Sequence, residues 1–129
     1  MSTPEDIGEI VMILLAFRDQ LKIYHWQTHS YARHKAADGL VEVMTEQMDR
    51  FMETLQGSRD MRMVIPSRKP FIRFENQTDA SILDIMNEFK KWLDIKLPAK
   101  LEPMDNDLRN IRDEILGSVN KSLYLFTLK

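Results

Sequence analysis

Apolar residues recur at helical spacing in four stretches of this chain, and this pattern limits the fold more than any other feature of the sequence. The four stretches predict helices over residues 4–29, 31–56, 79–97 and 106–126. Nowhere do apolar and polar residues alternate as they would in a half-buried strand. The sequence therefore predicts an all-α protein, and its 129 residues are expected to form one domain, residues 1–129.

Residues suited to helix ends lie at the borders of these stretches. Thr3 is a good N-cap and Pro4 suits the first helical position, so the first helix is expected to begin there. Ser30 is the predicted N-cap of the second helix, and Gly57 is predicted to follow its last residue. Pro98 is predicted to mark the end of the third helix.

The connection over residues 58–77 contains two prolines and has no helical period. Neighbouring antiparallel helices are usually joined by only about 2–8 residues. A longer connection is needed when consecutive helices run in the same direction, so residues 58–77 are predicted to be a crossover. Four amphipathic helices with one crossover between the second and third form a ferritin-like four-helix bundle, which is the fold we expect.

Composition excludes several classes of function. The chain has no cysteine, which rules out disulfides and thiolate chemistry. Its longest apolar run, residues 10–17, is far shorter than the ~20 residues that cross a bilayer, so no membrane partner is expected. The net charge of −2 gives no general attraction to nucleic acid. A cytoplasmic location is the default expectation for such a chain.

Basic residues are concentrated in and beside the predicted crossover. We interpret this segment as a solvated connection, and DNA binding is the less favoured alternative, at most weak. The residues that would carry it are Arg59, Arg62, Arg68, Lys69 and Arg73.

Histidine and carboxylate side chains gather at one end of the first helix and along the second. All three histidines lie between residues 25 and 34, and the carboxylates follow on the predicted second helix. Imidazole and carboxylate together suit iron, manganese or zinc. The residues in question are His25, His29, His34, Asp38, Glu42, Glu46, Asp49 and Glu53.

The spacing of these residues favours a site shared between two chains. No histidine has a glutamate three residues earlier, so the Glu-x-x-His motif of single-chain di-iron bundles is missing. Asp38 and Glu53 lie about 22 Å apart along one helix. An antiparallel second copy that crosses near residues 43–44 would bring Asp49 and Glu53 beside its partner's His34 and Asp38. Two-fold symmetry would then give two equal sites.

Three short motifs in this region resemble the ferroxidase signature of the Dps-type mini-ferritins. They are His25-Trp26, His34-x-x-x-Asp38 and Asp49-x-x-x-Glu53, with the second aspartate eleven positions after the first. The resemblance implies that His25, His34 and Asp38 of one chain bind Fe(II) together with Asp49 and Glu53 of its partner. His29 is a further candidate ligand, and zinc and manganese are candidate surrogates. The resemblance also implies oxidation of Fe(II) by peroxide or oxygen, and often storage inside a hollow dodecamer. The expected partner is a second copy of the chain, in a two-fold homodimer or a larger cage.

Less specific interpretations of the same residues remain open. Each histidine alone would more often be an ordinary core or helix-end residue than a ligand, and Trp26 is either a packing residue or a redox neighbour of the site. A non-enzymatic ferritin-like dimer with a degenerate metal site is therefore the alternative function.

Overall fold

The computed structural model describes residues 3–67 and 73–129. Arg68 and Lys69, two members of the basic segment, lie outside these described residues. The elements are α1 (Pro4–Gln27), α2 (Tyr31–Arg59), α3 (Ser81–Lys91), the π-helical turn η1 (Trp92–Lys96), α4 (Leu97–Ala99) and α5 (Asn106–Leu125). Neither described range contains a strand. The predicted all-α class is confirmed.

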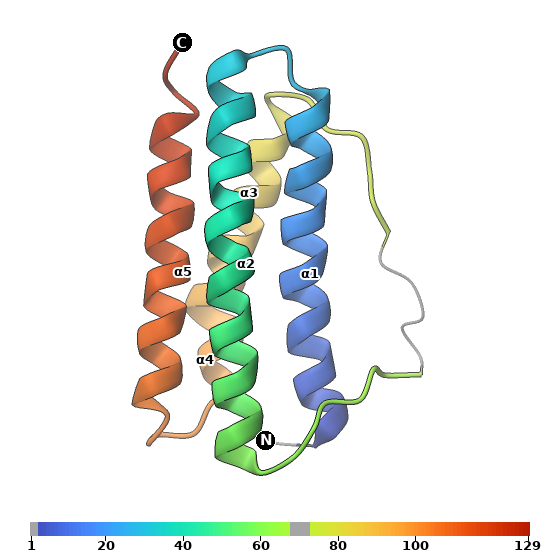
Figure 1. The fold of residues 1–129 in the computed structure, drawn as a ribbon, viewed down its shortest axis with the longest axis vertical. Helices are drawn as coiled ribbons and strands as arrows, with labels where there is room; N and C mark the ends of the chain where they lie inside the picture. The colour runs from blue at the N-terminus through green and yellow to red at the C-terminus, as the bar shows by residue number, and fades with distance from the viewer. Residues whose placement is uncertain (1–2, 68–72) are drawn as a thin grey trace.

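The helices form a bundle of four rods, because α3, η1 and α4 follow one another as a single rod (Figure 1). α1 and α2 are antiparallel, and α3 begins at the end of the bundle where α2 begins, so that α2 and α3 run in the same direction (Figure 1). α2 and α3 each pack against both α1 and α5. α2 and α3 therefore lie diagonally across the bundle.

The two predicted N-caps are confirmed. The Thr3 hydroxyl accepts a hydrogen bond from the Asp6 N–H at 3.1 Å, and the Asp6 carboxylate accepts one from the Thr3 N–H at 3.1 Å. The Ser30 hydroxyl accepts a hydrogen bond from the Arg33 N–H at 3.2 Å. Each cap satisfies main-chain N–H groups that have no partner within the helix.

The predicted end of the second helix is wrong. α2 continues through Gly57 to Arg59, and the residue in the left-handed conformation is Asp60, with a φ of 49°. The short polar side chain of aspartate tolerates this conformation better than most residues do. The Asp60 N–H donates to the main-chain oxygens of Gln56 and Gly57, which closes the last turn.

The third rod also continues beyond its predicted end, to Ala99, and it begins at Ser81 instead of residue 79. In a regular helix the ring of Pro98 would clash with the Asp94 carbonyl, and its missing N–H would leave that oxygen unbonded. The chain widens into η1 just before this point, where the Leu97 N–H donates to the Trp92 carbonyl five residues earlier. The wider turn accommodates the proline without ending the rod. The remaining helix ends lie within two residues of the prediction.

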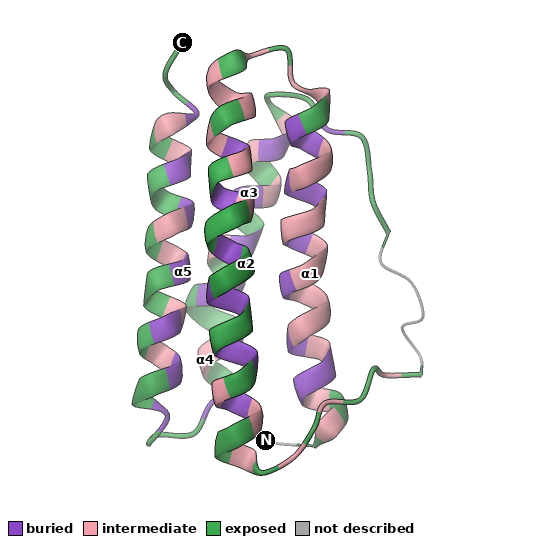
Figure 2. Ribbon diagram, viewed as in Figure 1, coloured by how far each residue is buried: buried purple, intermediate pink, exposed green. Residues whose placement is uncertain are grey.

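All four rods contribute to one hydrophobic core (Figure 2). Leu14 of α1, Phe51 of α2, Met86 of α3 and Ile115 of α5 are all fully buried. Every residue of α1 from Asp6 to His25 is buried or half-buried, whereas the outward face of α2 is exposed (Figure 2). No described helix combines the length and apolarity that crossing a membrane requires.

The long connection is fastened to α1 by main-chain contacts. The Val64 N–H donates to the Pro4 carbonyl at 3.0 Å, and the Gln20 side chain bonds both the N–H and the carbonyl of Glu75, at 2.9 and 2.7 Å. A Cβ atom at Gly8 would lie 2.0 Å from the Val64 carbonyl oxygen. The close approach of this segment to α1 therefore requires glycine at position 8.

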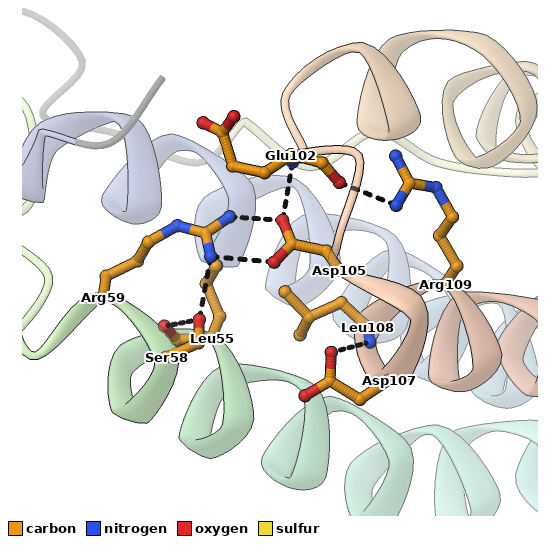
Figure 3. Close-up of polar contacts among 8 residues, drawn as sticks. All are labelled: Leu55, Ser58, Arg59, Glu102, Asp105, Asp107, Leu108 and Arg109. Atoms are coloured by element: carbon orange, nitrogen blue, oxygen red, sulfur yellow. Dashed lines mark hydrogen bonds and ion pairs between the residues drawn. The ribbon is translucent and has the colours of Figure 1, made fainter.

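A buried ion pair joins the end of α2 to the start of α5 (Figure 3). Arg59 donates to both carboxylate oxygens of Asp105, at 3.0 and 2.5 Å, and the Glu102 N–H donates to the same carboxylate at 2.6 Å. The two side chains are only 10% and 9% exposed. Arg59 lowers the pKa of Asp105 below its ordinary value. Arg59, assigned from sequence to the basic segment, is therefore engaged inside the bundle.

Candidate metal site

A three-residue turn between α1 and α2 brings His25 and His34 together. The Thr28 N–H closes the end of α1 by donating to the Tyr24 carbonyl at 2.9 Å, and Ser30 caps α2. His25 lies in the last turn of α1 and His34 in the first turn of α2. The short turn and the antiparallel packing of the two helices therefore place these side chains next to each other.

The two histidines bond each other reciprocally. Nδ1 of His25 lies 2.6 Å from the main-chain oxygen of His34, and Nδ1 of His34 lies 2.8 Å from the main-chain oxygen of His25. The rings stack with their centroids 3.8 Å apart and their planes at 17°. His25 is buried and His34 is half-buried.

These bonds fix the tautomer of both rings. A carbonyl oxygen can only accept, so each Nδ1 carries the proton that it donates. In a neutral ring the other nitrogen, Nε2, then has a free lone pair. Metal-binding histidines are commonly oriented in this way, by donation of one ring N–H to a main-chain carbonyl. The pair therefore presents two oriented nitrogen donors.

Asp38 lies beside the pair but is bonded to a residue that the sequence interpretation missed. One carboxylate oxygen, Oδ1, is 3.9 Å from Nε2 of His25 and accepts a hydrogen bond from the Lys22 ammonium at 2.8 Å. The pKa of Asp38 is lowered, first by the bond from Lys22 and then by the nearby charges, including both histidines. Lys22 precedes His25 by three residues on α1, and this i, i+3 spacing could have indicated it.

The other two aromatic candidates lie at the border of this cluster. Trp26 does not pack into the core of its own chain: its side chain is 68% exposed, and the Lys22 ammonium lies 5.4 Å from its ring centroid. His29 is exposed in the turn, where its charge helps to lower the pKa of Asp79. The structure thus places Trp26, more than His29, beside the histidine pair.

Asp49 and Glu53 lie on the same helix as His34 but far along it. The rise from His34 to Glu53 on the unbroken α2 is about 28 Å. Both carboxylates are exposed, and their proximity raises the pKa of Glu53, chiefly through a hydrogen bond with Asp49. Within one chain they cannot reach the histidine pair.

A single chain does not assemble a complete ligand set. Across residues 3–67 and 73–129, no group of three or more His, Asp or Glu side chains is arranged to hold a metal ion. His25, His34 and Asp38 are neighbours, yet they do not converge on one point.

Comparison with known families finds a matching family model. The model of a family of unknown function, DUF5856, matches residues 25–126. The chain belongs to this family. The DUF5856 region begins at His25 and includes all five proposed ligands, whereas Lys22 precedes it. Neither the curated proteins nor the solved structures contain a match to the chain.

Proposed function

We propose that this DUF5856 protein is a ferritin-like, Dps-like ferroxidase that binds and oxidises Fe(II) at a site shared by two copies of the chain. One copy supplies His25, His34 and Asp38, and the other supplies the partner's Asp49 and the partner's Glu53. The role would be iron storage or protection against oxidative stress.

The observation that most supports this proposal is the reciprocal His25–His34 pair. Each of the two stacked rings has its Nδ1 bonded to a carbonyl, and Nε2 of His25 lies 3.9 Å from the Asp38 carboxylate. Nitrogen and carboxylate oxygen together form a donor set that suits Fe(II).

The bundle topology is compatible with a ferritin-like fold. Two antiparallel pairs, α1 with α2 and α3 with α5, are joined by a long connection (Figure 1). This connectivity, with one long crossover, is that of ferritin-like bundles.

The surface between α1 and α2 supports a second copy as the source of the missing ligands. A groove there is lined by half-buried apolar residues of α1, Val11 and Leu15, and by Glu42 and Asp49 of α2. Val43, near the middle of α2, is 44% exposed and lines a separate groove between α2 and α5. An antiparallel copy that crosses α2 near Val43 would cover the exposed side of α2 and bring opposite ends of the two α2 helices together.

The roles of the residues follow from their chemistry. The imidazoles bind Fe(II) through Nε2, and the carboxylates bind it and stabilise the higher charge of Fe(III). Two Fe(II) ions each give one electron to a peroxide molecule, whose O–O bond breaks to form two hydroxide ions. Oxygen is the alternative oxidant. Binding should weaken as the pH falls through the range in which imidazole takes up a second proton, because imidazolium has no lone pair.

Fe(II) addition to the purified protein tests the proposal. Ferric absorbance is followed in air, and without air after adding peroxide, for the unmodified protein, Asp49→Ala and the control Asp113→Ala, which alters an exposed carboxylate on α5. The oligomer mass is measured on the same samples. We expect fast oxidation that Asp49→Ala removes and Asp113→Ala retains. Oxidation no faster than in buffer would overturn the proposal.

The second candidate is a non-enzymatic ferritin-like dimer with a degenerate metal site. The bond from Lys22 to Asp38 favours it, because an ammonium already neutralises one of the proposed ligands. A true site raises the melting temperature when its metal is added, since binding to the folded state stabilises it. A dimer whose melting temperature does not respond to Fe(II), Co(II) or Zn(II) would support the second candidate.

A further inference from the structure

Lys22 occupies a position in which its charge acts directly on the candidate metal site. Its ammonium donates to Oδ1 of Asp38 at 2.8 Å, and the same oxygen lies 3.9 Å from Nε2 of His25. A metal ion bound by Asp38 and His25 together would have to lie close to this oxygen. One carboxylate oxygen therefore faces both the ammonium and the imidazole that the proposed function uses.

A second contact holds the ammonium in this place. The nitrogen lies 5.4 Å from the centroid of the Trp26 ring, within the range of a cation–π interaction. Lys22 is on α1, Asp38 on α2 and Trp26 one turn beyond Lys22, so the ammonium bridges the two helices next to the histidine pair. The Lys22 and Asp38 side chains are 34% and 50% exposed.

The bond contributes little to the stability of the fold. Ion pairs at this level of exposure contribute little to the free energy of unfolding, because water screens the attraction and two side chains lose freedom. The electrostatic effect on an incoming cation is larger, because a divalent ion at the same carboxylate would meet a like charge within a few ångströms. An ammonium that stays on Oδ1 of Asp38 would repel a divalent cation bound by the same carboxylate.

We propose that the Lys22 ammonium competes with a divalent cation for Asp38. It binds the Asp38 carboxylate when no cation is bound, and it must leave that carboxylate before a divalent cation can bind. Lys22 then sets the affinity of the site for divalent cations and keeps it low. This inference rests on the proposed function, because it assumes that His25, His34 and Asp38 are ligands.

The test measures metal binding directly, without iron oxidation. Co(II) binding is followed by visible absorption and Zn(II) binding by calorimetry, for the unmodified protein and for Lys22→Met, which removes the charge and retains an unbranched apolar chain. Lys22→Arg keeps the charge, and Lys121→Met removes an exposed charge from α5. We expect Lys22→Met to bind the metal ion about tenfold more tightly than the unmodified protein does. Both controls, Lys22→Arg and Lys121→Met, should bind it with the affinity of the unmodified protein.

The outcomes separate this inference from the proposed function. Equal affinities for the unmodified protein and Lys22→Met would overturn the role of Lys22 and leave the metal site intact. Binding by neither protein at millimolar metal would overturn the proposed function and this inference together. Binding by Lys22→Met alone would support the inference in its strongest form.

A second readout needs no variant at residue 22. Addition of Zn(II), which is diamagnetic, should move the Trp26 indole N–H resonance of the unmodified protein, because the ammonium leaves its position over the ring. The Trp92 indole, buried between the rods, should not move. Zinc binding that leaves the Trp26 resonance unchanged would contradict the displacement of Lys22.

Discussion

His25 and His34 each use Nδ1 to bond the other's main-chain oxygen, at 2.6 and 2.8 Å, and their rings stack at 3.8 Å. This mutual bonding joins the end of α1 to the start of α2. It also gives both rings the same tautomer, in which Nδ1 carries the proton and Nε2 has the free lone pair. The contact that links the two helices therefore also orients both imidazole rings.

Glu53→Gln should separate folding from iron chemistry. The pKa of Glu53 is raised, chiefly by its hydrogen bond with Asp49, so its contribution to stability is present at low pH and is lost as the pH rises through the raised pKa. At neutral pH the substitution removes a repulsion, and the variant should be at least as stable as the unmodified protein in urea unfolding. It should nevertheless lose rapid Fe(II) oxidation, whereas Glu88→Gln on α3 should retain it. A variant that oxidises iron at the normal rate would exclude Glu53 as a ligand.

Asp105→Asn should destabilise the bundle by about 3 kcal/mol, because it leaves the Arg59 guanidinium buried without its counter-charge. Urea unfolding measures the change. Asp113→Asn is the matched control. It removes an aspartate that also pairs with an arginine, Arg112, but the Asp113 side chain is 62% exposed. The control should change stability by less than about 0.5 kcal/mol. Equal effects of the two variants would show that the Arg59–Asp105 pair has no special role.

Acid should weaken the fold through carboxyl groups whose pKa is lowered on folding. Arg59 lowers the pKa of Asp105, and Tyr24 lowers the pKa of Asp79, below the ordinary value of 3.8. A lowered pKa contributes stability that is complete above 3.8 and is lost as the pH falls through the folded-state pKa. The free energy of unfolding should therefore decrease as the pH falls below 3.8, and it should decrease less steeply in Asp105→Asn. Identical acid profiles for the variant and the unmodified protein would contradict this assignment.

Gly8→Ala should destabilise the protein by about 1–3 kcal/mol, because the new Cβ would lie 2.0 Å from the Val64 carbonyl oxygen. Gly117→Ala on α5 provides the control, since its Cβ would meet nothing within 4 Å. In a helix interior that change should stabilise by up to about 1 kcal/mol. Thermal unfolding of the two variants should therefore shift in opposite directions. A shift in the same direction would show that the connection moves away from α1 without cost.

Local chemistry explains the parts of the fold that could be predicted from sequence. The apolar spacing predicted four helical rods, and Thr3 and Ser30 cap helices as expected because an N-cap depends on residues within one turn. The long connection after α2 was predictable from its length and prolines. The helix ends predicted at Gly57 and Pro98 could not be located from sequence, because each depended on the conformation of neighbouring residues. Asp60 takes the left-handed conformation, and η1 widens the helix just before the proline.

The sequence by itself determined the helices, the absence of cysteine chemistry and the positions of the candidate ligands along them. Only the tertiary structure decided how those side chains are engaged. Stacking of His25 on His34 requires two helix ends to meet across a tight turn, and the bonds from Lys22 to Asp38 and from Arg59 to Asp105 join residues 16 and 46 positions apart. Such partners are chosen by packing in three dimensions, because many carboxylates and cations in the chain have suitable chemistry and only their positions in the bundle distinguish them.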